Sequence, residues 1–281
     1  MNGLLAGALM AAALLQPPPV FRVQVDLVRI EVLVTRGGQP LRGLGAADFE
    51  VRDNGRLQAL EPTLEEEAPV DAVLVLDTSS SMAGTKLVAL REAAGSFLDG
   101  LHGGDRAALI AFNDEVRLLE PISPDLARVR RALGGAEAGG KTALVDAVYA
   151  GLRSVEPSHR RTAVVVFSDG LDNRSWLRGI EVIDTARRTN AVVYGVAVRD
   201  ESDLDRPFLR DVTRASGGRF FKAASADELR PRFFDVLRDI RARYVLSYTP
   251  AGPEAKGWHS IEVKLKLVRG EVLARPRYWR Y

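Results

Sequence analysis

Apolar and charged residues alternate near both ends of the chain, over residues 20–66 and 244–281. Alternation with a period of two is typical of strands that bury one face. The tripeptide at Asp53–Gly55 separates two short runs of this kind, as in a tight hairpin. We therefore predict that the two ends of the chain pair into one small β-sandwich.

The middle of the chain, residues 70–243, has a different pattern. Near-continuous apolar runs alternate with segments whose apolar residues recur at helical spacing. The runs are 71–77, 106–112, 162–168 and 191–198. A continuous apolar run indicates a strand buried on both faces, and its alternation with helices favours a mostly parallel sheet. We predict a doubly wound α/β domain of about six strands, inserted between the two halves of the sandwich.

The first sixteen residues are apolar and contain no Lys or Arg. They are fewer than the ~20 residues that a membrane-spanning helix requires. Small residues at Ala11–Ala13 stand near a plausible cleavage point. We expect residues 1–16 to be a signal peptide or N-terminal anchor, which would place the protein in the periplasm, at the cell surface or outside the cell. A buried apolar N-terminus is the open alternative.

Composition narrows the function classes. The 281 residues are 46% hydrophobic and 27% charged, which is an ordinary globular balance. The formal net charge is +2, and no dense Lys/Arg block is interleaved with aromatic residues, so nucleic-acid binding has no support. The chain has no cysteine, which excludes disulfides and thiolate metal sites.

Oxygen-bearing side chains gather in three segments, 76–82, 139–147 and 166–173. Two of these follow predicted buried strands, and ligands of open α/β sheets bind at the carboxyl ends of strands. The candidate ligands are Asp77, Ser79, Ser81, Thr142 and Asp169. The set contains neither His nor Cys, and hard cations prefer such a shell, Mg²⁺ above all, with several waters retained. We predict a Mg²⁺ site at which Mn²⁺ can substitute.

The order of these five residues, with a glycine after Asp169, resembles the metal-ion-dependent adhesion site of von Willebrand factor A-type (vWA) domains. The resemblance covers about residues 70–243. It implies that Ser79 and Ser81 bind the metal directly and that Thr142 does so in the ligand-bound state. It also implies that Asp77 and Asp169 act largely through water, and that an Asp or Glu of a protein partner completes the shell.

The flanking segments resemble a bacterial family of secreted vWA-related proteins. The similar stretches are GLGAADFEVRDNG before the domain and YVLSYTPAG, GWHSIEVKL and ARPRYW after it. This resemblance implies architecture more than activity. One departure is Ser80, which stands where many vWA domains have glycine.

The predicted function is divalent-cation-dependent binding of an acidic side chain of a partner protein, and not catalysis. Contact with a membrane is expected only through an uncleaved N-terminal segment. Two alternatives stay open: a structural or chaperone-like envelope protein with a metal-stabilised vWA domain, and a degenerate vWA domain without metal. A Mg²⁺-dependent phosphatase that uses Asp77 as nucleophile is disfavoured, because Ser79 stands where such a site has its acid–base aspartate.

A serine hydrolase has little support either, because no GxSxG elbow exists. The three histidines, His102, His159 and His259, lie in polar segments that we expect at the surface. Three further sets of residues are expected to be structural: Met82, Phe112 and Phe167 as packing residues, Asp172 and Asn173 as a polar turn, and Trp258, Tyr278, Trp279 and Tyr281 mostly as sandwich core. The open alternatives are a second metal role for Asp172 and Asn173 and an exposed binding patch for the aromatic residues.

Overall fold

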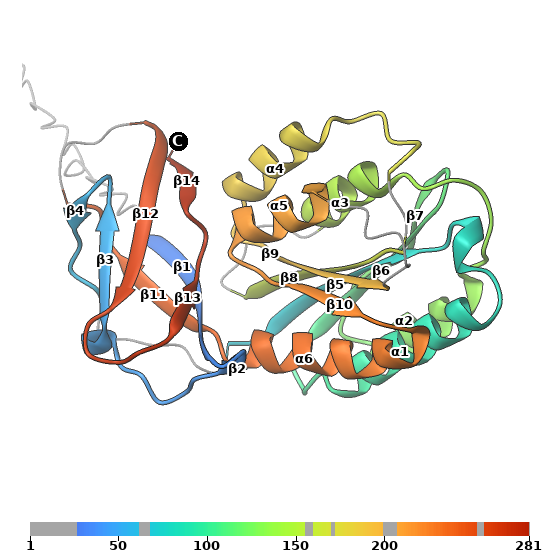
Figure 1. The fold of residues 1–281 in the computed structure, drawn as a ribbon, viewed down its shortest axis with the longest axis horizontal. Coiled ribbons are helices and arrows are strands. Elements are labelled where there is room, and N and C mark those ends of the chain that lie inside the picture. Colours follow the sequence, from blue (N-terminus) through green and yellow to red (C-terminus); the bar gives the residue numbers. More distant parts are fainter. Residues whose placement is uncertain are drawn as a thin grey trace, which may run out of the picture.

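The computed structural model describes residues 27–61, 68–154, 160–169, 172–198, 207–251 and 256–280. The predicted signal peptide lies outside these ranges. Within the described part of the chain, every helix is too short or too polar to cross a membrane. A helix-covered sheet and a smaller all-β part lie side by side along the long axis of the molecule (Figure 1).

A six-stranded sheet forms the centre of the larger part, in the order β10-β9-β8-β5-β6-β7. Its strands are β5 (Val70–Asp77), β6 (Arg106–Phe112), β7 (Val116–Ser123), β8 (Arg161–Phe167), β9 (Val192–Val198) and β10 (Phe220–Ala223). All neighbours are parallel except the edge strand β7, which runs antiparallel to β6. This confirms the predicted mostly parallel sheet.

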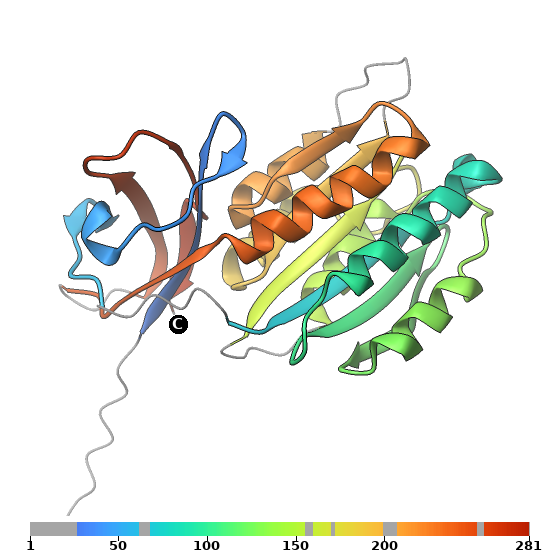
Figure 2. The same ribbon diagram turned by 90° about the horizontal axis from the view of Figure 1, so that it is seen from below.

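Helices cover both faces of this sheet. One face carries α1 (Thr85–Asp99), α2 (Leu126–Ala132) and α6 (Leu229–Arg241), as seen from below in Figure 2. The other carries α3 (Leu144–Arg153), α4 (Gly179–Arg188) and α5 (Pro207–Ser216) (Figure 1). Short 3₁₀ turns lie at Ala46–Asp48, Ser80–Met82, Leu133–Gly135 and Ala226–Glu228.

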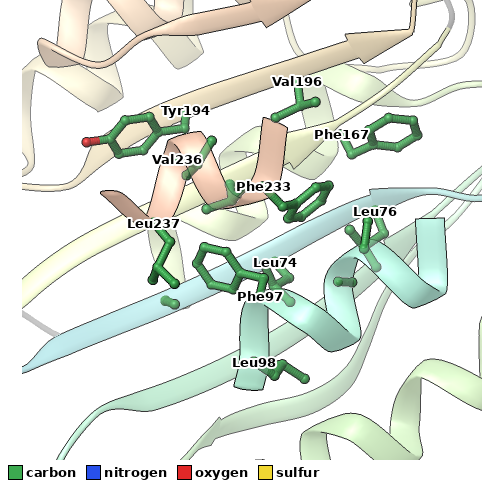
Figure 3. Packing of buried hydrophobic residues seen from close by; sticks show 14 of the residues in the cluster. Leu74, Leu76, Phe97, Leu98, Phe167, Tyr194, Val196, Phe233, Val236 and Leu237 are labelled. Carbon is green, nitrogen blue, oxygen red and sulfur yellow. The ribbon is translucent and has the colours of Figure 1, made fainter. Parts of the chain in front are cut away.

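The continuous apolar run of β5 is explained by two separate cores. Leu74 and Leu76 pack into the core under α1 and α6, where Phe97 and Phe233 meet edge to face with ring centroids 6.0 Å apart (Figure 3). Val73 and Val75 point to the opposite face and join the core under α3. Both sets are needed because successive side chains of a strand point to opposite faces. The predicted packing residues Met82, Phe112 and Phe167 are fully buried.

The two ends of the described chain form the predicted sandwich. One sheet contains β1 (Val28–Arg36), β2 (Gln39–Pro40), β11 (Tyr244–Tyr248) and β13 (Glu271–Leu273). The other contains β3 (Phe49–Asp53), β4 (Arg56–Leu57), β12 (Gly257–Leu265) and β14 (Arg277–Arg280). Strands from before and after the α/β part pair directly, β1 with β11 and β3 with β12. The two sheets enclose one apolar core, which includes Ile30, Phe49 and Tyr248.

Positive backbone angles close the hairpin between β3 and β4. Asn54 has φ +47° and Gly55 has φ +79°. Two successive residues with positive φ are the requirement of the tight turn that matches the twist of paired strands. The expected turn at Asp53–Gly55 is therefore present.

His259 contradicts its predicted place at the surface. Its side chain lies on the inward face of β12, is only 6% exposed, and has Nδ1 2.8 Å from Asp53 Oδ1. The other oxygen of Asp53 accepts hydrogen bonds from the hydroxyls of Tyr248 and Tyr278, at 3.0 and 2.8 Å. This buried polar group satisfies the imidazole, and so the polar surroundings in sequence were misleading. His102 is exposed as expected, and His159 lies outside the described residues.

The C-terminal aromatic residues divide between the core and the junction with the α/β part. Tyr278 is buried in the sandwich core as predicted. Trp258 and Trp279 instead form an edge-to-face pair, with centroids 5.3 Å apart, next to Arg188 of α4. Tyr281 lies outside the described residues.

The junction also contains buried arginines. Arg275 donates to the carbonyl of Thr189 and to Asn190 Oδ1, at 3.1 and 2.9 Å. Arg243 donates to the carbonyl of Glu31 in β1 at 3.2 Å and to the hydroxyl of Tyr194 in β9 at 2.7 Å. These bonds tie the sandwich to the end of the sheet at which the parallel strands begin, and the carboxyl ends of the strands lie away from it (Figure 1).

Candidate metal centre

The topology places two of the predicted ligands next to each other. Asp77 is the last residue of β5, and Asp169 lies two residues beyond the end of β8. These strands are parallel neighbours, so the residues that follow them emerge at the same edge. β5 lies between β6 and β8 in the sheet, so the strand order reverses direction at β5. The carboxyl edge at such a switch point is where open α/β sheets bind ligands.

Asp77 is fully buried and acts on its own loop. Its Oδ1 accepts the backbone N–H of Ser79 at 2.8 Å, and its Oδ2 accepts the hydroxyl of Ser168 at 2.6 Å. Burial raises the pKa of Asp77 above its ordinary value, although the hydrogen bonds from Ser168 and Ser79 oppose that shift. The carboxyl therefore holds the loop after β5 in the conformation that presents the serines.

A chain of hydrogen bonds joins the next three ligands. Ser79 Oγ lies 3.0 Å from Ser81 Oγ, and Ser81 Oγ donates to Asp169 Oδ1 at 2.6 Å. Ser79 is buried, whereas Ser81 is exposed, and so the group opens to the surface at Ser81. Hydroxyl and carboxylate oxygens from two loops thus converge on one point.

Thr142 makes no side-chain hydrogen bond to the other four candidate ligands among the bonds of the described residues. Its backbone is held in place by Asn173. Its N–H donates to Asn173 Oδ1 at 2.9 Å, and its carbonyl accepts the N–H of Asn173 at 3.0 Å. The loop before Thr142 lies directly against the serine loop, because the N–H of Ser80 donates to the carbonyl of Gly140 at 3.0 Å. The structure therefore places all five predicted residues in adjoining loops and links four of them by side-chain hydrogen bonds.

Gly140, at this contact, has a backbone conformation that favours glycine. Its φ is +74°, and a Cβ at this position would lie 2.0 Å from Asp114 Oδ2. A side chain would therefore meet both backbone strain and a steric conflict. No pattern in the sequence distinguishes Gly140 from its neighbour Gly139 in this respect.

Sequence reasoning missed three side chains that support the centre. Lys86, the second residue of α1, donates from Nζ to Asp169 Oδ2 at 2.7 Å. Ser168 orients Asp77, and Asn173 orients Thr142. The sequence predicts only a polar turn for Asn173, whereas in the structure its side-chain amide oxygen accepts the N–H of Thr142. A signal for Ser168 exists only in its position directly before Asp169.

Asp172 has a structural role, as expected. Its Oδ2 accepts the N–H of Val145 at 2.8 Å in the first turn of α3, where N–H groups lack helical partners. Its Oδ1 accepts the N–H of Ser175 at 3.2 Å.

The donor set fits a hard divalent cation. It consists of two carboxylates and three hydroxyls on adjoining loops, which are the donors that Mg²⁺-type ions prefer. Among the residues that the structure describes, no cluster of three or more His, Cys, Asp or Glu side chains competes as a metal site. Lys86 already shows that the oxygens of Asp169 attract a cation.

Comparison with known proteins agrees with this fold. Residues 72–171 match the family model of the von Willebrand factor type A domain. UPF0353 proteins of Mycobacterium tuberculosis and Mycolicibacterium vanbaalenii are 26% identical over 222 residues, which is 66% of this chain. The chain spans 63% of the length of these curated relatives.

Solved structures resemble the same part of the chain. A von Willebrand factor type A protein from Catenulispora acidiphila has a TM-score of 0.55 at 14% identity and covers 90% of this chain and 72% of its own. The vWF domain of the type V pili tip protein Mfa5 from Porphyromonas gingivalis has a TM-score of 0.53 at 14% identity, covering 62% and 95%. Proximal thread matrix protein 1 from the mussel byssus, with a zinc-occupied adhesion-site motif, has a TM-score of 0.57 at 17% identity, covering 65% and 48%.

At these identities the solved structures show the fold alone. Residues 72–171 are therefore similar in sequence to the von Willebrand factor type A domain, and the described sheet and helices have the fold of such domains. The similarity to the UPF0353 proteins extends beyond residues 72–171, since it covers 222 aligned residues.

Proposed function

We propose that this protein binds a partner protein through a divalent cation, Mg²⁺ or Mn²⁺, held by Asp77, Ser79, Ser81, Thr142 and Asp169. The observation that carries the proposal is the hydrogen-bonded chain from Ser79 through Ser81 to Asp169, at the carboxyl edge of the sheet. Side chains that bond to each other across two loops are preorganised to share one ion.

Each side chain has a distinct role. Ser79 and Ser81 supply direct oxygen ligands, and Thr142 supplies a third hydroxyl when the partner is bound. Asp77 and Asp169 orient the serines and the waters of the ion, as partners outside the inner shell commonly do. When bound, the ion would supply an electrophile to which a carboxylate of the partner could bind.

The charge around the site favours an acidic ligand. Lys86 already neutralises one carboxylate, and Asp77 is buried with both oxygens accepting hydrogen bonds. A divalent ion at this place keeps net positive charge, which an Asp or Glu of the partner would offset. The same burial leaves Asp77 poorly placed as the nucleophile of a phosphatase, since attack requires an accessible oxygen.

Two further features of the proposal concern architecture and location. We assign residues 70–243 to the vWA domain and 20–66 with 244–281 to the sandwich. We place the protein outside the cytoplasm, in the periplasm, at the surface or secreted, on the basis of the apolar residues 1–16.

The test is calorimetric titration of the full chain with Mg²⁺ and Mn²⁺. We expect saturable binding by the parent and none by Ser79→Ala/Ser81→Ala, which removes both hydroxyls. Ser80→Ala is the matched control, because this exposed neighbour contributes its backbone N–H and not its side chain to the loop contact.

Equal binding by the parent and the double variant would contradict the assigned ligands. Binding that raises thermal stability without increasing affinity for any acidic ligand would favour the structural alternative. Turnover of a phosphoester that Asp77→Asn abolishes would favour the enzyme.

A further inference from the structure

Exposed aromatic, apolar and basic side chains alternate in the loop that follows the metal centre. Trp176 is 87% exposed and Ile180, in the first turn of α4, is 56% exposed. The side chains of Arg174 and Arg178 are 49% and 78% exposed. A large indole with so little cover has no role in packing the core.

The backbone that carries Trp176 is nevertheless held firmly. Its N–H donates to Asp146 Oδ2 at 3.0 Å, and the N–H of Leu177 donates to Asp146 Oδ1 at 2.9 Å. On the other side, Ser175 donates its N–H to Asp172. The carboxylates of Asp146 and Asp172 therefore fix the backbone on both sides of the exposed Trp176 indole. A rigid backbone lowers the entropy cost of a contact made by its side chain.

This loop lies beside the proposed ligands. Asn173 exchanges two hydrogen bonds with the backbone of Thr142, and Trp176 follows only three residues later. Three residues of chain span at most ~10 Å. In Figure 1, the loop into α4 and the loop into α3 both lie on the side of the α/β part away from the sandwich. One peptide segment can therefore reach the centre and the indole together.

The exposed arginines add charge complementarity. Arg178 pairs with Glu181 at 2.6 Å, and Arg174 lies 3.9 Å from Asp114. Exposed pairs of this kind contribute little to stability, so an acidic partner can replace them at small cost. Trp and Arg are also the residue types that contribute most to the affinity of protein interfaces.

We propose that the loop from Arg174 to Ile180 is a second contact surface for the partner, with Trp176 as its anchor. The occupant is an acidic peptide segment that places one carboxylate on the metal and an aromatic or apolar side chain against Trp176. The proposal rests on the metal-dependent function above and adds the kind of sequence that the site selects.

The test uses two defined polymers, poly-L-glutamate and a glutamate–tyrosine copolymer, labelled for fluorescence anisotropy with Mg²⁺ or with EDTA. We expect the full chain to bind both only with Mg²⁺ and to prefer the copolymer. The Trp176→Ala variant should bind the copolymer about tenfold more weakly than the parent does. Its affinity for poly-L-glutamate should equal that of the parent. Phe234→Ala, which removes a 45%-exposed ring on α6, is the matched control and should change neither affinity.

The outcomes distinguish failure of the proposed contact surface from failure of the proposed metal-dependent function. If the Trp176→Ala variant binds both polymers with Mg²⁺ and prefers the copolymer as strongly as the parent does, the contact surface is overturned. The metal-dependent function then remains supported. Absence of Mg²⁺-dependent binding to either polymer by the parent overturns both. Ser79→Ala/Ser81→Ala should lose both polymers, and thermal unfolding of each variant confirms that it is folded.

Discussion

At the scale of single residues, Lys86 links the metal centre to helix α1. Its ammonium group lies 2.7 Å from Asp169 Oδ2, and its side chain is 37% exposed while that of Asp169 is 4% exposed. A fixed ammonium and a divalent ion repel each other over this short range. We therefore expect Lys86 to stabilise the loops when no ion is bound and to weaken the binding of the proposed ion.

Replacing Lys86→Met should consequently have opposite effects with and without metal. In EDTA we expect the free energy of unfolding to fall by about 1 kcal/mol or less, because the pair is partly exposed. In calorimetric titration we expect Mg²⁺ to bind about tenfold more tightly. Lys141→Met, an exposed lysine beside Thr142, controls for the general loss of positive charge and should change both quantities less. Weaker Mg²⁺ binding by Lys86→Met would mean that the lysine chiefly positions Asp169.

At the scale of elements, the centre depends on how closely two loops approach. The loop after β5 and the loop before α3 exchange backbone hydrogen bonds, from Gly139 N–H to the carbonyl of Thr78 at 2.9 Å and from Ser80 N–H to Gly140. The buried strand and the amphipathic helix on either side hold these loops in place. Gly140 lies at this contact with a positive φ that a side chain would strain.

Gly140→Ala should therefore destabilise the protein and weaken the site. We expect the free energy of unfolding to fall by about 1–2 kcal/mol from the left-handed backbone conformation alone. The affinity for Mg²⁺ should also fall, because the displaced loop carries Thr142. Gly139→Ala is an adjacent control, since a Cβ there meets nothing within 4 Å. Chemical denaturation and calorimetry measure the two effects, and equal damage from both variants would contradict the argument.

At the scale of the whole molecule, α4 extends from the neighbourhood of the metal centre to the sandwich. It follows the Trp176 loop, and near its end the guanidinium of Arg188 lies 4.9 Å from the ring centroid of Trp258 and 4.1 Å from that of Trp279. Strands β12 and β14, which carry these rings, come from the C-terminal part of the chain. The contact therefore helps to fix the sandwich against the α/β part.

Arg188→Ala should loosen that junction without changing the metal centre. An exposed cation–π contact contributes about 0.5–1 kcal/mol, and we expect the free energy of unfolding to fall by about that amount. The fluorescence of Trp258 and Trp279 should change, and the substitution Trp176→Phe removes the third tryptophan of the chain as a reporter. Arg187→Ala, which removes a pair with Asp184 on the same helix, is the control. Identical spectra for the two variants would contradict the role of Arg188.

The sequence by itself determined the features that depend on local periodicity. The double-sided run of β5 indicated a buried strand, the alternation at both ends indicated a sandwich, and Asn54 with Gly55 indicated a tight turn. Burial of alternate or of all positions along a strand leaves a pattern that a single sequence displays. The order of Asp77, Ser79 and Ser81 at a strand end indicated where chemistry would gather.

Only the tertiary structure decided which side chains meet. Lys86 and Asp169 stand on different elements, and so do Ser168 and Asp77, and their pairing depends on how β5, β8 and α1 pack. Leu267 is apolar but 92% exposed because β12 ends at Leu265, and His259 is buried where Asp53 satisfies it. Contacts of this kind are set by distance in space and leave no period in the chain, because each partner is chosen by the fold and not by its neighbours in sequence.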